Sequence, residues 1–371
     1  MPPKPTLKDV AKLAGCSTAI VSTVVNGSRR GTNILASAET QKRVRAAAKK
    51  LNYHANYASR SLARNATQTI GLYIQPHPFS GLGYRYEGAI IQGIEHASQA
   101  CNYDLLAINL SGGDDPSVCT NKFAEKRIDG LILMHVDHEA DWVDPLVKQA
   151  PNVVAVNYYG SGKVDRINFD DQQATGLAVK YLHELGHRRI GFIGSRREAI
   201  GPGMQLRMQG FRSAMTEIGL EYNADWIWST AEGEDLLPLE EELDTFKADA
   251  RDVIDWLKAM GDHRPTAFVA YNDLTAVHLM RQCQSQGLTI PSEMSIVGID
   301  GAEVGELVWP ALTSIRQPFA EMGKRATELV IERAEQAAKS GKVRSPRKRT
   351  DELFAPEIIP RSSTRPADAN T

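Results

Sequence analysis

The sequence lacks the marks of a membrane, exported or zinc-binding protein. No apolar run approaches the ~18 residues needed to span a bilayer, and the first twenty residues are interrupted by charges and contain no signal-peptide core. Cysteine is scarce: Cys16, Cys101, Cys119 and Cys283 are far apart and form no C-x-x-C pair, which disfavours disulfides and zinc sites. We therefore expect a cytoplasmic protein that has no membrane association and no cofactor.

Catalytic signatures are also missing. There is no G-x-S-x-G or H-E-x-x-H motif, and the segment "GSGKVD" lacks the spaced glycine and the Ser/Thr of a phosphate-binding P-loop. His183 and His187 are four residues apart, but they stand where a helix end runs into "GHRR", and a surface turn is far more common there than a metal site. The sequence thus disfavours an enzyme.

Charge is distributed unevenly along an otherwise ordinary globular composition. Hydrophobic residues make up 42% and charged residues 24% of the 371 residues, a length that indicates two or three compact domains. Residues 1–65 contain twelve Lys or Arg and two acidic residues, a net charge of +10, so the remaining 306 residues carry −12. A basic head on an acidic body favours contact of the head with a polyanion, although a solvated charged face would give the same count.

The basic head predicts three short helices. Thr6 can cap the first together with Asp9, and Gly15 ends it, while Ser17 and Ser37 can cap the second and third. The apolar residues at helical spacing, which mark the buried faces, are Leu7, Val10, Ala11, Ala14, Ile20, Val21, Val24, Val25, Val44, Ala47, Ala48 and Leu51.

The second of these segments, "CSTAIVSTVVNG", decides how the head is interpreted. Its β-branched residues would also suit a strand, but their spacing favours a helix. Two helices joined by a tight glycine turn and supported by a third form a helix-turn-helix, whose second helix enters the major groove of DNA. Its outward face would then carry Thr18, Ala19, Ser22 and Thr23. These side chains cannot make the bidentate contacts of Arg or Gln, so we expect weak direct readout of base sequence.

Two long segments and six short motifs identify a family. The segments are "TLKDVAKLAGCSTAIVSTVVNG" and "SAETQKRVRAAAKKLNYHANYASRSLARNATQTIGLYI". The motifs are "GHRRIGFIGS", "LRMQGFRSAM", "AYNDLTA", "SIVGIDG", "LTSIRQPFAEMG" and "APEIIPRSST". In this order, and over nearly the whole chain, they resemble the lactose-repressor (LacI/GalR) family of bacterial transcription regulators. The resemblance implies a DNA-binding repressor controlled by a small molecule.

The segment after the third helix gains a meaning from this resemblance. Residues 57–63 could form at most two helical turns, which are marginal alone in water. The family implies a hinge helix that orders on operator DNA, pairs with its dimer mate in the minor groove, and inserts Leu62 between base steps. Simple packing of Leu62 against the body is the alternative. The expected DNA contacts are Thr6, Ser17, Thr18, Ala19, Ser22, Thr23, Asn26, Arg29, Arg30, Asn56, Tyr57, Arg60, Leu62 and Arg64.

The body alternates short apolar segments with helical ones. The candidate strands are "TIGLYIQ", "YDLLAINL", "DGLILMHV", "NVVAVNYY", "RIGFIGS", "AFVAYN" and "MSIVGID". Such alternation predicts doubly wound parallel sheets with ligands at the carboxyl ends of the strands. The family's likeness to periplasmic sugar-binding proteins implies two lobes, with the chain crossing near Phe169, Gln317 and Ser345 and an effector between them. The expected fold class is an all-α helix-turn-helix head followed by an α/β body of two doubly wound lobes.

Effector contacts are carried over motif by motif. Arg207 in "QLRMQGF", Asn272 and Asp273 in "YNDLTA", and Asp300 in "VGID" match polar contacts of the family, and a guanidinium and carboxylates suit sugar hydroxyls. The full expected set is Phe79, Tyr86, Asp170, Arg207, Trp228, Asn272, Asp273 and Asp300. For each aromatic residue, burial in the core is the alternative. For Arg207 with Asp300, an ion pair between the lobes is the alternative.

The sequence therefore predicts a homodimeric repressor that binds a palindromic operator and responds to a sugar or sugar derivative. A solute-binding protein without DNA function, or the same regulator with a nucleobase or other corepressor, is the alternative. The expected domains are 1–55 (helix-turn-helix), 56–67 (hinge helix and linker), 68–362 (effector binding and dimerisation) and 363–371 (flexible tail). Within the body we expect an N-lobe over 68–168 and 318–345 and a C-lobe over 169–317 and 346–362.

Overall fold

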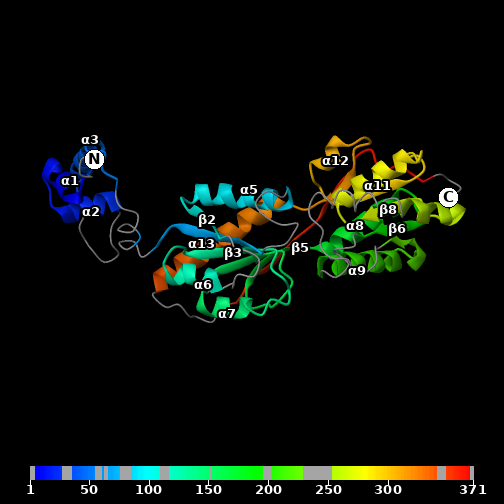
Figure 1. The fold of residues 1–371 in the computed structure, drawn as a ribbon, viewed down its shortest axis with the longest axis horizontal. Helices are drawn as coiled ribbons and strands as arrows, with labels where there is room; N and C mark the ends of the chain where they lie inside the picture. Colours follow the sequence, from blue (N-terminus) through cyan, green and yellow to red (C-terminus); the bar gives the residue numbers. More distant parts are fainter. Residues whose placement is uncertain are drawn as a thin grey trace.

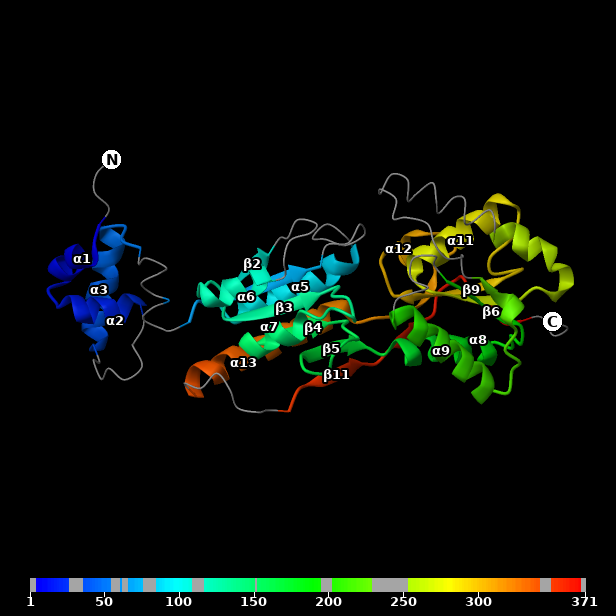
Figure 2. The same ribbon diagram turned by 60° about the horizontal axis from the view of Figure 1, so that its bottom comes forward.

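The computed structural model describes residues 5–26, 36–54, 61, 66–75, 85–108, 117–150, 152–194, 202–228, 253–340 and 348–367. Figures 1 and 2 show a helical head, drawn in blue, and two α/β lobes. Each lobe has one sheet with helices packed against it, as the sequence predicts.

Three helices form the head: α1 (Leu7–Ala14), α2 (Thr18–Asn26) and α3 (Ala38–Lys50). The predicted caps are confirmed. Thr6 and Asp9 form a capping box, and Gly15 ends α1 in the left-handed conformation with φ of 65°. The side chains of Ser17 and Ser37 each accept a backbone N–H of the following turn. These caps satisfy N–H groups that a helix start leaves without partners.

One fully buried valine from each helix forms the centre of the head. Val10, Val21 and Val44 have no exposed surface, and small alanines of α1 and α3 lie around them. The predicted inward face of α2 is therefore correct for Val21, whereas its other apolar residues are only partly buried. A core this small lets α2 keep its opposite side in solvent.

The N-lobe contains a parallel six-stranded sheet in the order β11-β5-β4-β3-β1-β2. Its strands are β1 (Thr69–Ile74), β2 (Asp104–Ile108), β3 (Gly130–Met134), β4 (Val153–Val156), β5 (Asp165–Phe169) and β11 (Asp351–Phe354). Its helices are α5 (Arg85–Ala100), α6 (Ser117–Ala124), α7 (Val143–Gln149) and α13 (Phe319–Ser340).

The C-lobe contains a second six-stranded sheet in the order β12-β10-β9-β8-β6-β7, in which β12 is antiparallel to β10. Its strands are β6 (Ile190–Ile193), β7 (Ile227–Trp228), β8 (Ala267–Ala270), β9 (Ser295–Asp300), β10 (Thr313–Arg316) and β12 (Glu357–Ile359). Its helices are α8 (Asp171–Glu184), α9 (Pro202–Glu217), α11 (Asp273–Ser285) and α12 (Val304–Leu307), and residues 253–259 are also helical.

Both faces of each sheet are covered, which explains the continuous apolar strands. In β3, Ile132 and Met134 pack in the same core as α5 and α13, whereas Leu131 and Leu133 pack with α6 and α7 on the opposite face. Because side chains alternate across a strand, only an all-apolar segment can fill two cores at once.

Two helices of the N-lobe cross unusually closely. A Cβ atom on Gly93 would lie 1.9 Å from the carbonyl oxygen of Ala320, and one on Gly323 would lie 2.0 Å from that of Ile90. Glycine at these positions lets α5 and α13 pack backbone against backbone. Both helices thereby stay close to the same face of the sheet.

Over the residues that the structure describes, the chain crosses between the lobes three times, and one predicted crossing is wrong. At the first two crossings, β5 ends in the N-lobe at Phe169, and β10 ends in the C-lobe one residue before Gln317. The third does not lie at Ser345, because β11 pairs with β5 of the N-lobe and only β12 joins the C-lobe. Figure 2 shows β11 beside β5. As a half-exposed edge strand, "DELF" gives only a weak apolar signal.

The predicted flexible tail from residue 363 is also wrong over its described part. Ser363 is fully buried, donates to the carbonyl of Ile296 at 2.6 Å and accepts the N–H of Thr313 at 2.8 Å. Ala367 donates its N–H to the carbonyl of Leu185 at 2.8 Å. Residues 363–367 therefore belong to the C-lobe.

None of the helices in the described ranges is long and apolar enough to cross a membrane.

Candidate DNA-binding face and effector site

The amino-terminal end of α2 is the exposed part of the predicted recognition helix. Ser17, Thr18 and Ala19 are exposed, whereas Ser22 and Thr23 are half-buried. The Thr23 hydroxyl donates to the carbonyl of Ala19 at 3.0 Å, so its proton is already used within the helix. First-turn residues of a recognition helix are those that reach base edges.

Other predicted DNA contacts are engaged locally or lie outside the described residues. Thr6 is exposed, but its hydroxyl donates to the carboxylate of Asp9 at 2.7 Å as part of the cap. Asn26 ends α2, and nothing is described of its side chain. The predicted contacts outside the described residues are Arg29, Arg30, Asn56, Tyr57, Arg60, Leu62 and Arg64, together with the predicted effector contact Phe79.

Arg207 of α9 lies at the centre of a group of polar side chains where the lobes meet. The guanidinium is buried, and its Nε donates to Oδ1 of Asp171 at 2.7 Å. Its Nη1 donates to the backbone carbonyl of Tyr271, and the same group lies 4.6 Å from the centre of the Tyr271 ring. Burial lowers the pKa of Arg207, but Asp171, Tyr271 and Asp300 together outweigh burial, so the net shift is upward and the charge is retained.

Asp300 approaches the same guanidinium from the end of β9. Its Oδ1 lies 3.9 Å from Nη2 of Arg207. Its φ of 136° is a backbone conformation that L-residues rarely adopt, and such strain is typical of functional sites. Because Arg207, Asp171 and Asp300 all belong to the C-lobe, the ion pair is not the interlobe bridge that was the alternative prediction.

The N-lobe contributes Tyr86, Asn157 and Tyr159 to this group. The side-chain amide of Asn157 donates to the hydroxyl of Tyr86, whose ring makes edge contacts with His135 and Phe319 at centroid distances of 5.1 and 5.0 Å. Burial raises the pKa of Tyr86, and the charges of the C-lobe residues act on it, so it lies close to them. We call the following residues the interlobe cluster: Tyr86, Asn157, Tyr159, Asp171, Arg207, Tyr271 and Asp300.

Four of the predicted effector residues make structural contacts in this arrangement. Asp170 caps α8 by accepting the N–H of Gln173 at 2.9 Å, and Asn272 caps α11 by accepting the N–H of Thr275 at 2.8 Å. These caps occupy side-chain oxygens that we expected to face a ligand.

Asp273 and Trp228 are likewise turned to structural contacts. Asp273 is fully buried and accepts the hydroxyl of Ser314 and the N–H of Ala302, the latter at 2.6 Å. Trp228 packs its ring against Trp256, at a centroid distance of 5.3 Å, in the core of the C-lobe.

Sequence reasoning missed Asp171, Asn157, Tyr159 and Tyr271. Asp171 immediately follows the predicted Asp170. Asn157 and Tyr271 directly follow β4 and β8, and Tyr159 is the third residue after β4, where the open-sheet rule places ligands. Their position after a strand was the signal that could have identified them.

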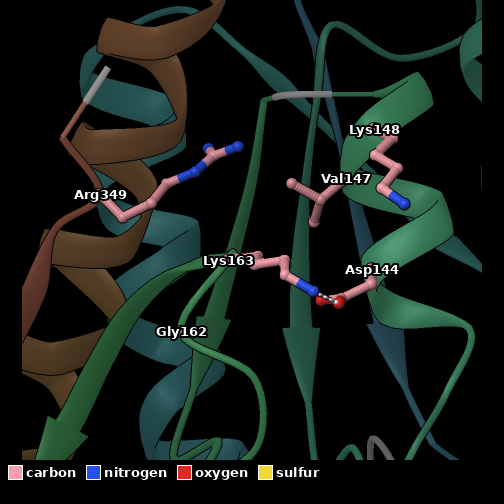
Figure 3. A pocket seen from close by; sticks show the side chains of 6 residues that line it. All are labelled: Asp144, Val147, Lys148, Gly162, Lys163 and Arg349. Atoms are coloured by element: carbon pink, nitrogen blue, oxygen red, sulfur yellow. Dashed lines mark hydrogen bonds and ion pairs between the residues drawn. The ribbon is translucent and has the colours of Figure 1, made fainter. Parts of the chain in front are cut away.

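A separate hollow of about 350 Å³ lies on the N-lobe, and Figure 3 shows it from close by. It is lined by Asp144, Val147, Lys148, Gly162, Lys163 and Arg349. Lys163 is paired with Asp144, and this hydrogen bond lowers the pKa of the carboxyl. The hollow shares no residue with the interlobe cluster. Within the described part of the chain, no group of three or more His, Cys, Asp or Glu is placed to hold a metal ion.

Comparison with known proteins matches both parts of this architecture. Residues 6–56 match the model of "Bacterial regulatory proteins, lacI family", and residues 179–364 match that of a "Periplasmic binding protein-like domain". The HTH-type transcriptional repressor PurR of Vibrio cholerae is 35% identical over 331 residues, which are 88% of this chain and 91% of the relative. PurR of Vibrio parahaemolyticus is 33% identical over 97% of this chain and 98% of its own. The chain belongs to the lacI family.

Solved structures show that the lacI-family fold extends over the whole chain. The lac repressor dimer bound to operator and the anti-inducer ONPF has a TM-score of 0.74 at 22% identity, covering 98% of this chain and 100% of that chain. A complex of the regulator CelR with cellobiose has a TM-score of 0.64 at 23% identity, covering 97% and 99%. The predicted family and fold class are therefore confirmed. This lacI-family protein is a DNA-binding transcriptional repressor.

Proposed function

We propose that this lacI-family repressor binds a palindromic operator as a homodimer. In this proposal, a sugar or sugar derivative binds the interlobe cluster and lowers or raises the affinity for the operator. The exposed first turn of α2 supports the first part, because Ser17, Thr18 and Ala19 are free of the head's core. The hinge contacts, with Leu62 as the wedge, remain part of the proposal from the sequence. Because its target is chromosomal DNA, we place the protein in the cytoplasm.

The chemistry of the interlobe cluster carries the proposal for the effector. Asp171 and Asp300 flank Arg207, so carboxylate oxygens and guanidinium N–H groups are presented within one small region. Carboxylates accept hydrogen bonds from vicinal hydroxyls, and a fixed guanidinium donates to hydroxyl oxygens. The rings of Tyr86 and Tyr271 add flat apolar surface against which a sugar ring can pack.

Exposed apolar side chains of the C-lobe support the homodimer. Leu274 of α11 is 44% exposed, Leu307 of α12 is 73% exposed, and Trp309, which follows α12, is 84% exposed. The Gln284 side chain donates to the carbonyl of Trp309 at 2.8 Å, which ties this loop to α11. Large apolar side chains this exposed are typical of surfaces that another protein chain covers.

A thermal-shift screen tests the effector class. Sugars, sugar phosphates and nucleobases are added one at a time to the full chain, and a ligand of the folded body raises the melting temperature. We expect a neutral sugar or sugar derivative to give the rise. A rise in melting temperature with nucleobases and none with sugars would contradict the sugar effector and favour the alternative, a nucleobase corepressor.

Sedimentation tests the dimer. We expect the full chain to sediment as a dimer and Trp309→Ser with Leu307→Ser to shift it toward the monomer at micromolar concentration. A matched double variant at Leu13 and Leu353, which are exposed on the head and the N-lobe, should leave the dimer intact. A monomeric wild-type chain would contradict the proposal.

A further inference from the structure

A single carboxylate of the interlobe cluster is shared by both lobes. Asp171 is the first residue of α8 in the C-lobe, and its Oδ1 accepts Nε of Arg207 at 2.7 Å. Its other oxygen, Oδ2, accepts the hydroxyl of Tyr159, which lies after β4 in the N-lobe. Asp171 therefore connects the binding pair of one lobe to a side chain of the other.

The surroundings shield the hydrogen bond between Tyr159 and Asp171 from water. Asp171 is almost fully buried and Tyr159 is half-buried, so water competes little for Oδ2 of Asp171. A Cβ atom on Gly203 would lie 3.9 Å from Oδ2 of Asp171 and 3.9 Å from the hydroxyls of both Tyr159 and Tyr271. Three polar groups thus converge over the start of α9, close to Arg207 on the same helix.

The charge state of the two partners suits a lasting contact. Burial and the adjacent carboxylate raise the pKa of Tyr159, so the phenol keeps its proton and remains a donor throughout the physiological range. A buried carboxylate that loses a donor without replacement is left under-solvated, which disfavours separating the lobes at this point.

We propose that the hydrogen bond from Tyr159 to Asp171 holds the two lobes in the arrangement of this structure, and that the effector acts by changing the contacts of the same Asp171–Arg207 pair. This inference rests on the proposed function, in which the effector binds at the interlobe cluster. A ligand shifts an equilibrium between two arrangements only through its different affinity for them. Asp171 supplies that difference, because it contacts the N-lobe in one arrangement and not in another.

The conservative variant Tyr159→Phe tests this role without removing the ring. The measurement is the affinity of the effector-free protein for an operator duplex selected from a random DNA library with the wild-type chain. Loss of a hydrogen bond to a buried charged group is worth about 10- to 100-fold in the lobe equilibrium. We expect operator affinity to change by up to that factor and by at least about fivefold. Small-angle scattering of the same effector-free samples should show a changed radius of gyration.

The matched control is Tyr181→Phe. The hydroxyl of Tyr181 lies 3.1 Å from that of Thr364, and both residues belong to the C-lobe, so the same atom is removed without touching the lobe contact. We expect Tyr181→Phe to bind the operator like the wild type. Unchanged operator affinity and unchanged scattering for Tyr159→Phe would overturn the inference and reduce Tyr159 to an effector contact. Failure of the wild-type chain to select any DNA would instead refute the proposed function.

Discussion

Replacing Asp273 with asparagine should make the stability of the C-lobe depend on pH in a way that the structure specifies. Asp273 holds the turn at 300–302: its carboxylate accepts the N–H of Ala302 and the hydroxyl of Ser314, and that hydroxyl oxygen accepts the N–H of Gly301 at 3.0 Å. Burial raises the pKa of Asp273 from 3.8 to about 6. The strained backbone of Asp300 lies in this turn.

The sign follows from proton binding. The folded chain binds a proton at Asp273 more tightly than the unfolded chain does, so between about pH 4 and 6 the folded state carries more protons. The contribution of Asp273 to the free energy of unfolding is therefore present at low pH and is lost as pH rises through 6. By linkage, this upward shift lowers the free energy of unfolding by on the order of 1 kcal/mol between pH 5 and pH 7.5. Asparagine does not titrate, so Asp273→Asn lacks this dependence.

Denaturant unfolding at pH 5 and pH 7.5 measures the effect. Four of the five tryptophans, Trp226, Trp228, Trp256 and Trp309, lie in the C-lobe, so tryptophan fluorescence follows that lobe. Other titrating groups contribute equally to both chains and cancel in the difference between wild type and variant. We expect the variant to become less stable relative to the wild type by on the order of 1 kcal/mol on going from pH 7.5 to pH 5. A difference that is independent of pH would refute the reasoning.

Three further outcomes are expected. Deleting residues 1–65 should abolish operator binding and leave the effector's thermal shift intact; specific DNA binding by the remaining body would contradict the assignment of the head. Gly323→Ala should lower stability by about 1–3 kcal/mol in thermal unfolding, because its Cβ would lie 2.0 Å from a backbone oxygen, whereas Gly88→Ala, with nothing within 4 Å, should not. Arg207→Lys should weaken effector binding at least about tenfold by calorimetry, since one ammonium cannot reproduce the forked contacts to Asp171 and Tyr271; equal affinity would remove Arg207 from the site.

The sequence was most informative where local chemistry decides the structure. Thr6 with Asp9, and Ser17, mark helix starts by the hydrogen bonds that their side chains make within one turn, and the structure has those bonds. Buried strands such as β3 were visible as continuous apolar runs because both faces of the sheet are covered. In contrast, β11 is an edge strand that pairs with β5, some 185 residues earlier in the chain, and no local pattern reports such a pairing.

The interlobe cluster, which we propose as the effector site, shows the limit of motif reasoning more sharply. The sequence places two aspartates side by side at the first crossing, and one residue decides their roles: Asp170 is the cap of α8, so its carboxylate turns back to the helix, whereas Asp171 begins the helix and turns to Arg207. The same holds for Asn272, the cap of α11, and Asp273, its first residue. The residue whose side-chain oxygen accepts the free backbone N–H of a first turn is set by where the helix begins. Helix boundaries are the least certain part of a sequence pattern.

The position of the site along the chain explains how binding and lobe movement can be coupled. Asp171 is two residues beyond Phe169, the last N-lobe residue before the first crossing. Phe319, whose ring contacts Tyr86, is the first residue of α13 and directly follows the second crossing. Any change in lobe arrangement must alter backbone angles at these crossings, and therefore moves the side chains attached next to them. In our proposal, an effector that contacts the interlobe cluster therefore acts on the crossings themselves, without a longer chain of intermediate contacts.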